Sequence, residues 1–156
     1  MRHGEAANIA GGVDHERPLT ERGRHQADAT ADQLKLMSLN LGLMVTSTAR
    51  RARETGDQVQ GRLGPEGPTS RDQQASFYYE GIDSLVHHLA GIDSAHTSLI
   101  AIGHNPTWSL AAQAFTGGFR GLKTGECLVL SSEAETWQDA MTSSQWHLDA
   151  HLSPQI

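Results

Sequence analysis

The sequence has little of what marks secreted and membrane proteins. Its single cysteine, Cys127, excludes an internal disulfide framework and fits a reducing compartment, and its position in an apolar run predicts a buried, inert thiol. No apolar run approaches the roughly 18 residues of a membrane span, and no secretory signal precedes the first motif. We therefore expect a cytoplasmic protein with no membrane partner.

Basic residues are also few: the sequence has 12 Lys and Arg against 18 Asp and Glu, which gives a formal net charge of -6. This acidic balance argues against nucleic acid as a partner. The chain has 156 residues, of which 37% are hydrophobic, and this is enough to bury the core of one domain. Apolar strand-like runs alternate with helical patterns. We therefore expect an α/β fold, a three-layer α/β/α sandwich with a mainly parallel sheet, as a single domain over residues 1–156.

The hydrophobic periodicity predicts the individual elements. Helices are expected over about 20–37, 50–60, 82–89 and 106–115, and strands over 41–45, 99–102 and two late segments, near 126–130 and 146–149. Ser47 or Thr48 is expected to cap the second helix, and Asn105 the fourth. Residues 61–70 contain Gly-Pro twice and are expected to form a loop.

Two histidines lie at the start of predicted loops: His3 is close to the start of the sequence, and His104 follows a predicted strand. His3 lies in Arg2-His3-Gly4-Glu5, and His104 follows the apolar run Leu99–Ile102. A partly neutral imidazole can attack phosphorus without a helper base, and the planar fork of Arg2 fits phosphate oxygens. His104 precedes the amino end of a predicted helix, where backbone amides favour a bound phosphate.

Three arginines, Arg50, Arg51 and Arg53, fall in the first turn of the second predicted helix. The positive end of the helix dipole disfavours cations there, so stability does not explain the cluster, whereas an anion site does. A solvated basic face paired with Glu54 and Asp57 accounts for Arg50 and Arg53. We expect one arginine of the cluster to bind an anion.

These motifs together resemble the histidine phosphatase superfamily, which includes cofactor-dependent phosphoglycerate mutases and acid phosphatases. The resemblance covers nearly the whole chain, through Arg2–Glu5, Arg17–Gly23, Ser47–Thr55 and Gly103–Pro106. The segments Phe77–Gly81 and Leu122–Gly125 look most like the small bacterial phosphohistidine phosphatases of the SixA type.

The resemblance implies a role for each motif. His3 would be the nucleophile that becomes transiently phosphorylated, Arg2 and Arg51 would bind the phosphoryl oxygens, and His104 would donate to them in the transition state. Arg51 is chosen because it occupies the arginine of the family's Ser-x-x-x-Arg-Ala pattern, which starts here at Ser47. Since arginines already supply charge for the phosphate, neither a metal nor a cofactor is expected.

A proton donor for the leaving group is harder to find in this sequence. The candidates are Glu80, Asp83 and Glu5. Glu80 is preferred because it lies nearest to the point in the chain where the middle of the sheet should place a residue at the site. Asn8 is expected to reach the phosphate, because related mutases carry a nearby asparagine. A phosphohistidine substrate needs less acid assistance than an alkyl phosphate, because the imidazole that leaves is protonated near neutral pH.

The sequence therefore favours a phosphohistidine (protein) phosphatase of the SixA type that acts on a phosphorylated substrate. Two alternatives stay open: a small-molecule phosphomonoesterase or mutase of the same superfamily, and a catalytically weak module that binds a phospho-ligand. Sites in open α/β sheets form at the carboxyl ends of strands, so an apolar strand of about five residues is expected ahead of Arg2. We expect this first strand to lie upstream of Met1.

Overall fold

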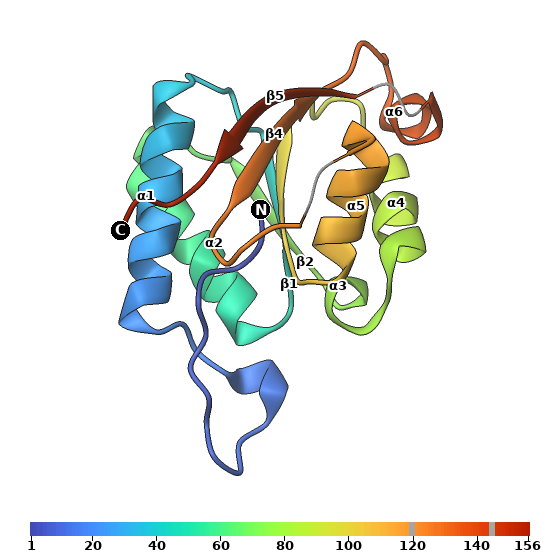
Figure 1. Ribbon diagram of the computed structural model, residues 1–156. Helices are drawn as coiled ribbons and strands as arrows, with labels where there is room; N and C mark the ends of the chain where they lie inside the picture. Colours follow the sequence, from blue (N-terminus) through green and yellow to red (C-terminus); the bar gives the residue numbers. More distant parts are fainter. Residues whose placement is uncertain (119–120, 144–145) are drawn as a thin grey trace.

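A sheet lies between two layers of helices in the computed structural model, which describes residues 1–118, 121–143 and 146–156 (Figure 1). One layer contains α1 (Glu21–Leu36) and α2 (Arg50–Leu63). The other contains α3 (Ser76–Tyr79), α4 (Ile82–Ala90) and α5 (Thr107–Thr116). The predicted three-layer α/β/α architecture is confirmed.

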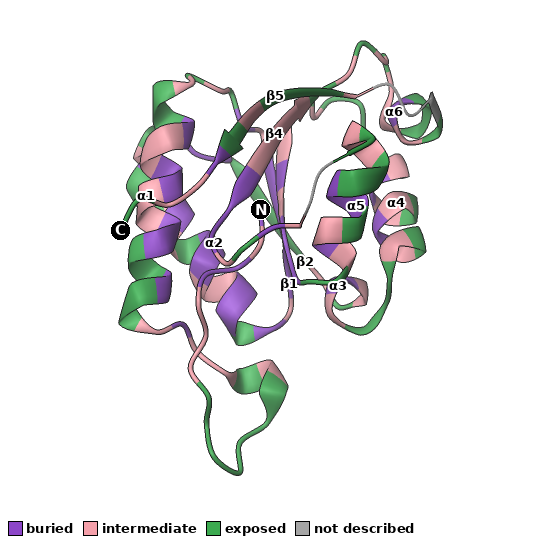
Figure 2. Cartoon of the chain, in the orientation of Figure 1, coloured by how far each residue is buried: buried purple, intermediate pink, exposed green. Residues whose placement is uncertain are grey.

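The strand β1 (Leu43–Ser47) forms the buried centre of a parallel three-stranded sheet (Figure 2). It pairs with β2 (Ser70–Gln74) on one side and with β3 (Leu99–Ile102) on the other. Alternate residues of β1 enter different cores: Met44 belongs to the core that includes α1 and α2, and Val45 to the core that includes α4 and α5. Burial on both faces explains why this strand reads as a short apolar run.

Residues 1–3 connect this sheet to an antiparallel pair, β4 (Cys127–Ser131) and β5 (His147–Leu152). Arg2 forms a parallel bridge with Gly103, just beyond the end of β3, and its backbone N–H donates to the Glu126 carbonyl at 2.9 Å. The His3 N–H donates to the Gly103 carbonyl at 3.1 Å. Arg2 and His3 therefore lie at the carboxyl end of β3, where sites in open α/β sheets form.

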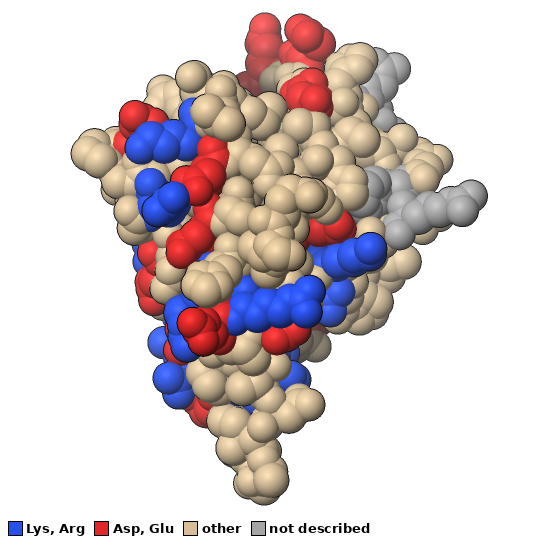
Figure 3. Space-filling model, turned by 60° about the vertical axis from the view of Figure 1, so that its left-hand side comes forward, with Lys and Arg blue, Asp and Glu red and all other residues tan. Residues whose placement is uncertain are grey.

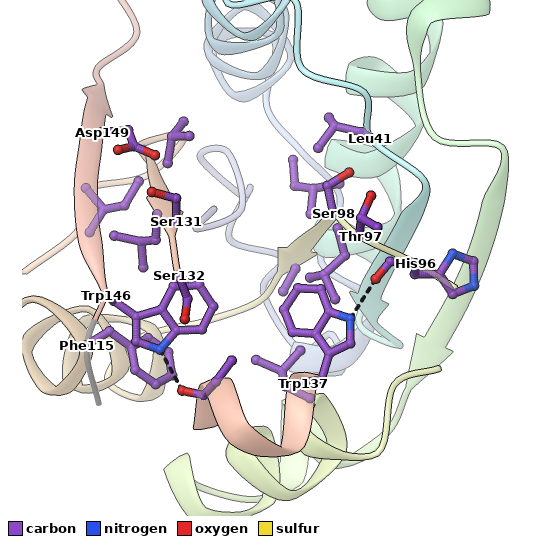
Figure 4. Close-up of a pocket in the computed structure, with 18 of the residues that line it drawn as sticks. Leu41, His96, Thr97, Ser98, Phe115, Ser131, Ser132, Trp137, Trp146 and Asp149 are labelled. Atoms are coloured by element: carbon purple, nitrogen blue, oxygen red, sulfur yellow. Dashed lines mark hydrogen bonds between the residues drawn. The ribbon is translucent and has the colours of Figure 1, made fainter. Parts of the chain in front are cut away.

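A cavity of about 470 Å³ opens beyond Met1 between β3 and β4 (Figure 4). Apolar side chains dominate its lining, and among them are Leu41 and the indoles of Trp137 and Trp146. Trp137 lies in α6 (Trp137–Ser143) and donates from Nε1 to the His96 carbonyl at 2.7 Å. Neither His3 nor His104 is among the residues that line this cavity, so it is separate from the histidine motifs.

The prediction for residues 61–70 is wrong in part, because that segment is only partly a loop. The helix α2 continues to Leu63 and ends at Gly64, whose φ of 58° suits glycine. A short 3-10 turn, η2 (Gly64–Glu66), follows, and β2 begins at Ser70. The strand β2 has the sequence Ser-Arg-Asp-Gln-Gln and four exposed residues, so no apolar alternation marks it. Its backbone pairing with β1 holds it at the edge of the sheet.

The predicted helix caps were also only partly correct. Ala49, rather than Ser47 or Thr48, is the residue before α2, and no side chain caps it. Pro106 precedes α5, but the Asn105 side chain still accepts from the Ser109 backbone N–H at 3.2 Å. The prediction that Cys127 is buried and unpaired is confirmed.

Acidic and basic side chains are mixed on the face over α1 (Figure 3). Asp32 of α1 and Arg62 of α2 form an ion pair at 2.6 Å, and the basic side chains on this face do not merge into one continuous area. Within the part of the chain that the structure describes, no helix combines the length and apolar character needed to cross a bilayer.

Candidate active site

The imidazole of His3 is buried and held in one tautomer. Its Nδ1 lies 2.6 Å from the Gly4 carbonyl oxygen. A carbonyl only accepts, so Nδ1 carries the proton and Nε2 keeps a free electron pair. Burial is the main cause that lowers the pKa of His3 to about 4; the charges of Arg51 and Arg2 act in the same direction, and the Gly4 hydrogen bond acts against them. At neutral pH, His3 is therefore an uncharged nucleophile.

The backbone around His3 is fixed by close packing that only glycine permits. A Cβ on Gly4 would lie 2.3 Å from the carbonyl oxygen of Gly23 in α1. The Gly4 N–H donates to Thr55 Oγ1 at 3.0 Å, and the Thr55 hydroxyl donates to the Arg51 carbonyl at 2.7 Å. The segment that carries His3 is thereby attached to both α1 and α2.

His104 faces His3, with the ring centroids 5.1 Å apart and the ring planes 54° apart. Its Nε2 lies 2.7 Å from the Ser47 hydroxyl at the end of β1. Its Nδ1 is buried and has no hydrogen-bond partner among the described residues. Burial, followed by the neighbouring His3 and Arg51, lowers the pKa of His104 to about 3, so this ring is also uncharged at neutral pH.

Two arginines flank the histidine pair. The buried Arg51 donates to the Asp14 carbonyl at 2.9 Å and to its carboxylate at 3.2 Å. Arg2 donates from one terminal nitrogen to the Leu122 carbonyl at 2.9 Å, and its buried Nε has no partner among the described residues. Burial lowers the pKa of Arg2, although the charge of Glu126 acts in the opposite direction. Arg2, His3, Arg51 and His104, predicted from separate motifs, thus come together in one site.

Two predicted site residues lie apart from this cluster. Asn8 is exposed and forms no hydrogen bond within the described residues. Glu80 is exposed at the end of α3 and accepts a hydrogen bond from the Ser84 hydroxyl. Of the other candidate acids, Asp83 is exposed in the first turn of α4, and Glu5 accepts from the Thr20 hydroxyl at 2.9 Å. None of these four residues is in hydrogen-bond contact with His3 or His104.

The expected basic face of α2 is present, with one difference in its pairing. Arg50 pairs with Glu54 at 2.6 Å, as predicted. Arg53 donates to the Thr48 carbonyl at 3.0 Å, whereas Asp57 pairs with Arg71 of β2 at 2.7 Å. Because β2 was not predicted, this partner for Asp57 was not foreseen.

Asp14 is the main site residue that sequence reasoning missed. It lies in a 3-10 turn, η1 (Asp14–Glu16), and its carboxylate accepts from Arg51, from Arg17 at 3.0 Å and from the Tyr78 hydroxyl at 2.7 Å. These bonds, that of Tyr78 first, hold the pKa of Asp14 well below its usual range. The only signal in the sequence was that Asp14 lies three residues before the Arg17-Pro18 motif. Hydrophobic periodicity does not show that this exposed turn contacts α2 and α3.

Comparisons with known proteins agree with this geometry. A family model described as the histidine phosphatase superfamily (branch 1) matches residues 1–74. An uncharacterized chloroplastic protein of Arabidopsis thaliana is 28% identical over 151 residues, which cover 90% of this chain and 69% of that protein.

Two solved structures share the whole fold. The protein histidine phosphatase SixA complexed with tungstate has a TM-score of 0.82 at 22% identity, with coverage of 99% of this chain and 94% of that chain. A protein assigned as the phosphohistidine phosphatase SixA of Nakamurella multipartitia has a TM-score of 0.82 at 24% identity, with coverage of 100% and 94%. These likenesses confirm the predicted α/β/α sandwich, and they show that it is the phosphoglycerate mutase-like fold, as the resemblance to a superfamily that includes phosphoglycerate mutases implies.

The protein thus has a phosphoglycerate mutase-like α/β fold, and its candidate site brings two buried histidines together. The residues that match the histidine phosphatase superfamily (branch 1) include the Arg2-His3-Gly4 motif, and the chain resembles that superfamily over this part.

Proposed function

We propose that this enzyme hydrolyses phosphohistidine through a phosphorylated His3 intermediate. The observation that carries the proposal is the state of His3, which is uncharged, fixed by Gly4 with Nε2 unprotonated, and 5.1 Å from His104 between ring centroids. A nucleophile prepared in this way needs no separate base.

The reaction proceeds in two steps. In the first, His3 Nε2 forms a bond to phosphorus while the bond from phosphorus to the substrate nitrogen breaks. The electron pair of the broken bond stays on the leaving imidazole. When the second nitrogen of that imidazole is protonated, the ring leaves as a neutral molecule. Water then attacks the phosphorus of phospho-His3, the bond to Nε2 breaks, and inorganic phosphate is released as the water gives up a proton.

Arg2, Arg51 and His104 would stabilise the charge on the phosphoryl oxygens. The two guanidinium groups supply fixed positive charge and planar sets of donors. The Ser47 hydroxyl already accepts from the Ala49 N–H at 3.2 Å and can donate its own proton to His104 Nε2. In that arrangement His104 carries its proton on Nδ1, the buried nitrogen without a partner, and donates it to the phosphoryl group.

Among the described residues, no carboxylic acid is placed to protonate a leaving group at the histidine pair, and this supports an easily displaced leaving group. Asp14 is the carboxylate that contacts Arg51, and its lowered pKa keeps it ionised, so it accepts protons in hydrogen bonds but has none to give. Glu80 is bound to Ser84, away from the histidine pair. An imidazole leaving group suits such a site better than an alkoxide, which requires a proton donor.

The test measures phosphate release and trapping of the intermediate. The enzyme is mixed with 3-phosphohistidine or an aryl phosphate, quenched in base and analysed for phosphate bound to nitrogen. We expect turnover and a base-stable, acid-labile phosphoenzyme, both lost in His3→Ala and both retained in the exposed control His25→Ala. Saturable phosphate binding without turnover would instead support the binding module.

A further inference from the structure

A series of aromatic rings leads from the candidate site to the protein surface. The His104 ring lies 5.6 Å from Tyr78, and Tyr78 lies 4.8 Å from Tyr79, between ring centroids. His15 lies 4.8 Å from Tyr78, and its ring is nearly parallel to that of Tyr79, at 11° and 6.3 Å. Exposure increases along the series, from buried His104 through half-buried Tyr78 and His15 to Tyr79, which is 72% exposed. We call His15, Tyr78 and Tyr79 the aromatic rim.

Hydrogen bonds at the ring edges and packing beneath α3 hold the aromatic rim in place. Tyr78 donates to Asp14, and the Arg51 guanidinium carbon lies 5.8 Å from the centroid of the Tyr78 ring. His15 Nε2 lies 3.0 Å from Thr48 Oγ1. The neighbouring Phe77 is buried in the core of this helical layer. Tyr78 and His15 are therefore held in place before a ligand arrives, which reduces the entropic cost of binding.

The geometry of phosphoryl transfer determines which part of the substrate meets the rim. Attacking and leaving atoms lie on opposite sides of phosphorus. His3 attacks from the buried side, so the leaving group points toward solvent. Tyr78 contacts both Arg51 and His104, which would hold the phosphoryl group, and its neighbours Tyr79 and His15 extend from there to the surface.

We propose that the aromatic rim is the leaving-group subsite and that it binds a planar aromatic ring, the imidazole of phosphohistidine in particular. The proposal rests on the function proposed above and adds how the substrate is selected. Aromatic pairs favour offset-stacked or edge-to-face contacts, and the faces of Tyr79 and His15 offer both. A seryl or sugar phosphate has no aromatic ring to place there and cannot form an aromatic pair with the rim.

The experiment compares two substrates that share a phosphorus–nitrogen bond but differ in the ring. These are 3-phosphohistidine and phosphoramidate, whose leaving group is ammonia. The variant Tyr79→Ala changes an exposed side chain, so folding is preserved. We expect kcat/KM for 3-phosphohistidine to fall about fivefold, as for the loss of one aromatic contact, while that for phosphoramidate stays within about twofold.

Two controls separate the ring from other effects. Tyr79→Phe keeps the ring and should retain the activity on 3-phosphohistidine, and Leu36→Ala removes another exposed apolar side chain, at a position that is 86% exposed, and should change neither substrate. Inhibition gives a second readout: phenylphosphonate should inhibit the parent more strongly than methylphosphonate, and Tyr79→Ala should reduce this difference.

The outcomes distinguish the subsite from the function on which it rests. Equal losses on both substrates, or no loss on either, would overturn the subsite and leave the phosphatase intact. A parent enzyme that hydrolyses neither phosphorus–nitrogen compound would overturn the proposed function and the subsite with it.

Discussion

His3 and His104 lie with their ring centroids 5.1 Å apart, and both rings are uncharged at neutral pH because burial lowers their pKa values to about 4 and about 3. The same burial that keeps His3 nucleophilic makes the fold sensitive to acid. The uncharged state of the two rings and the stability of the fold therefore both depend on the burial of these side chains.

The first prediction concerns stability as a function of pH. Between pH 6.5 and about 4 the unfolded chain binds a proton at His3 that the folded protein does not, so the free energy of unfolding falls as the pH falls. The difference between a pKa of 6.5 and one of about 4 corresponds to about 3 kcal/mol. His3→Asn keeps a donor for the Gly4 carbonyl and removes the titrating ring, so its curve from denaturant unfolding at pH 4 to 7 should be flatter by about this amount. Parallel curves would show that His3 does not titrate in this way.

The second prediction assigns Asp14 the role of positioning Arg51. Asp14→Asn removes a charge-assisted bond to a buried guanidinium, and because Asp14 itself is half exposed we expect only about a tenfold loss in kcat/KM. Asp14 also raises the pKa of Tyr78 through their hydrogen bond, so an ultraviolet titration of the variant should show that pKa reduced.

Asp32→Asn is the matched control for this change, because it breaks the exposed pair with Arg62 and should leave activity unaltered. If Asp14→Asn instead strengthens inhibition by inorganic phosphate, Asp14 competes with the substrate for Arg51 and does not position it.

The third prediction concerns Gly103, which allows α5 to approach the end of β3. A Cβ at this position would lie 2.3 Å from the buried ring of Trp108. Gly103→Ala should therefore destabilise the protein by about 1–3 kcal/mol, as overpacking does, and lower its melting temperature by several degrees. Gly61→Ala is the matched control, because Gly61 lies in α2 with open space around it and alanine favours a helix, so its melting temperature should stay the same or rise.

The sequence predicted the elements whose signal is local. Strands β1 and β3 are apolar runs buried in the sheet, and α1 and α4 have clear helical spacing, so periodicity placed them. The four central site residues each stand in a short motif. Their convergence, and the choice of Arg51 among three arginines, followed from the resemblance to the histidine phosphatase superfamily.

What the sequence did not show depends on contacts between distant segments. The strand β2 has no apolar pattern, and its pairing with β1 is a property of the backbone. Asp14 reaches Arg51 and Tyr78 across 37 and 64 residues of the chain, and no local pattern encodes such contacts. Glu80 was chosen for its position along the chain, but its side chain bonds to Ser84 one helical turn later.

The last prediction concerns Glu80 and the leaving group. Because Glu80 is exposed and bound to Ser84, Glu80→Gln should change kcat/KM by much less than the roughly 100-fold expected for the loss of a general acid. Without such an acid, the parent itself should depend steeply on the leaving group, so 3-phosphohistidine and aryl phosphates should react much faster than serine or sugar phosphates. The measurement is kcat/KM across a series of aryl and alkyl phosphates for the parent and for Glu80→Gln, with Glu66→Gln as the matched control at an exposed carboxylate in η2. A flat dependence in the parent that becomes steep only in Glu80→Gln would identify Glu80 as the proton donor. The favoured substrate would then be a phosphomonoester, because an alkoxide leaving group is the one that requires that proton.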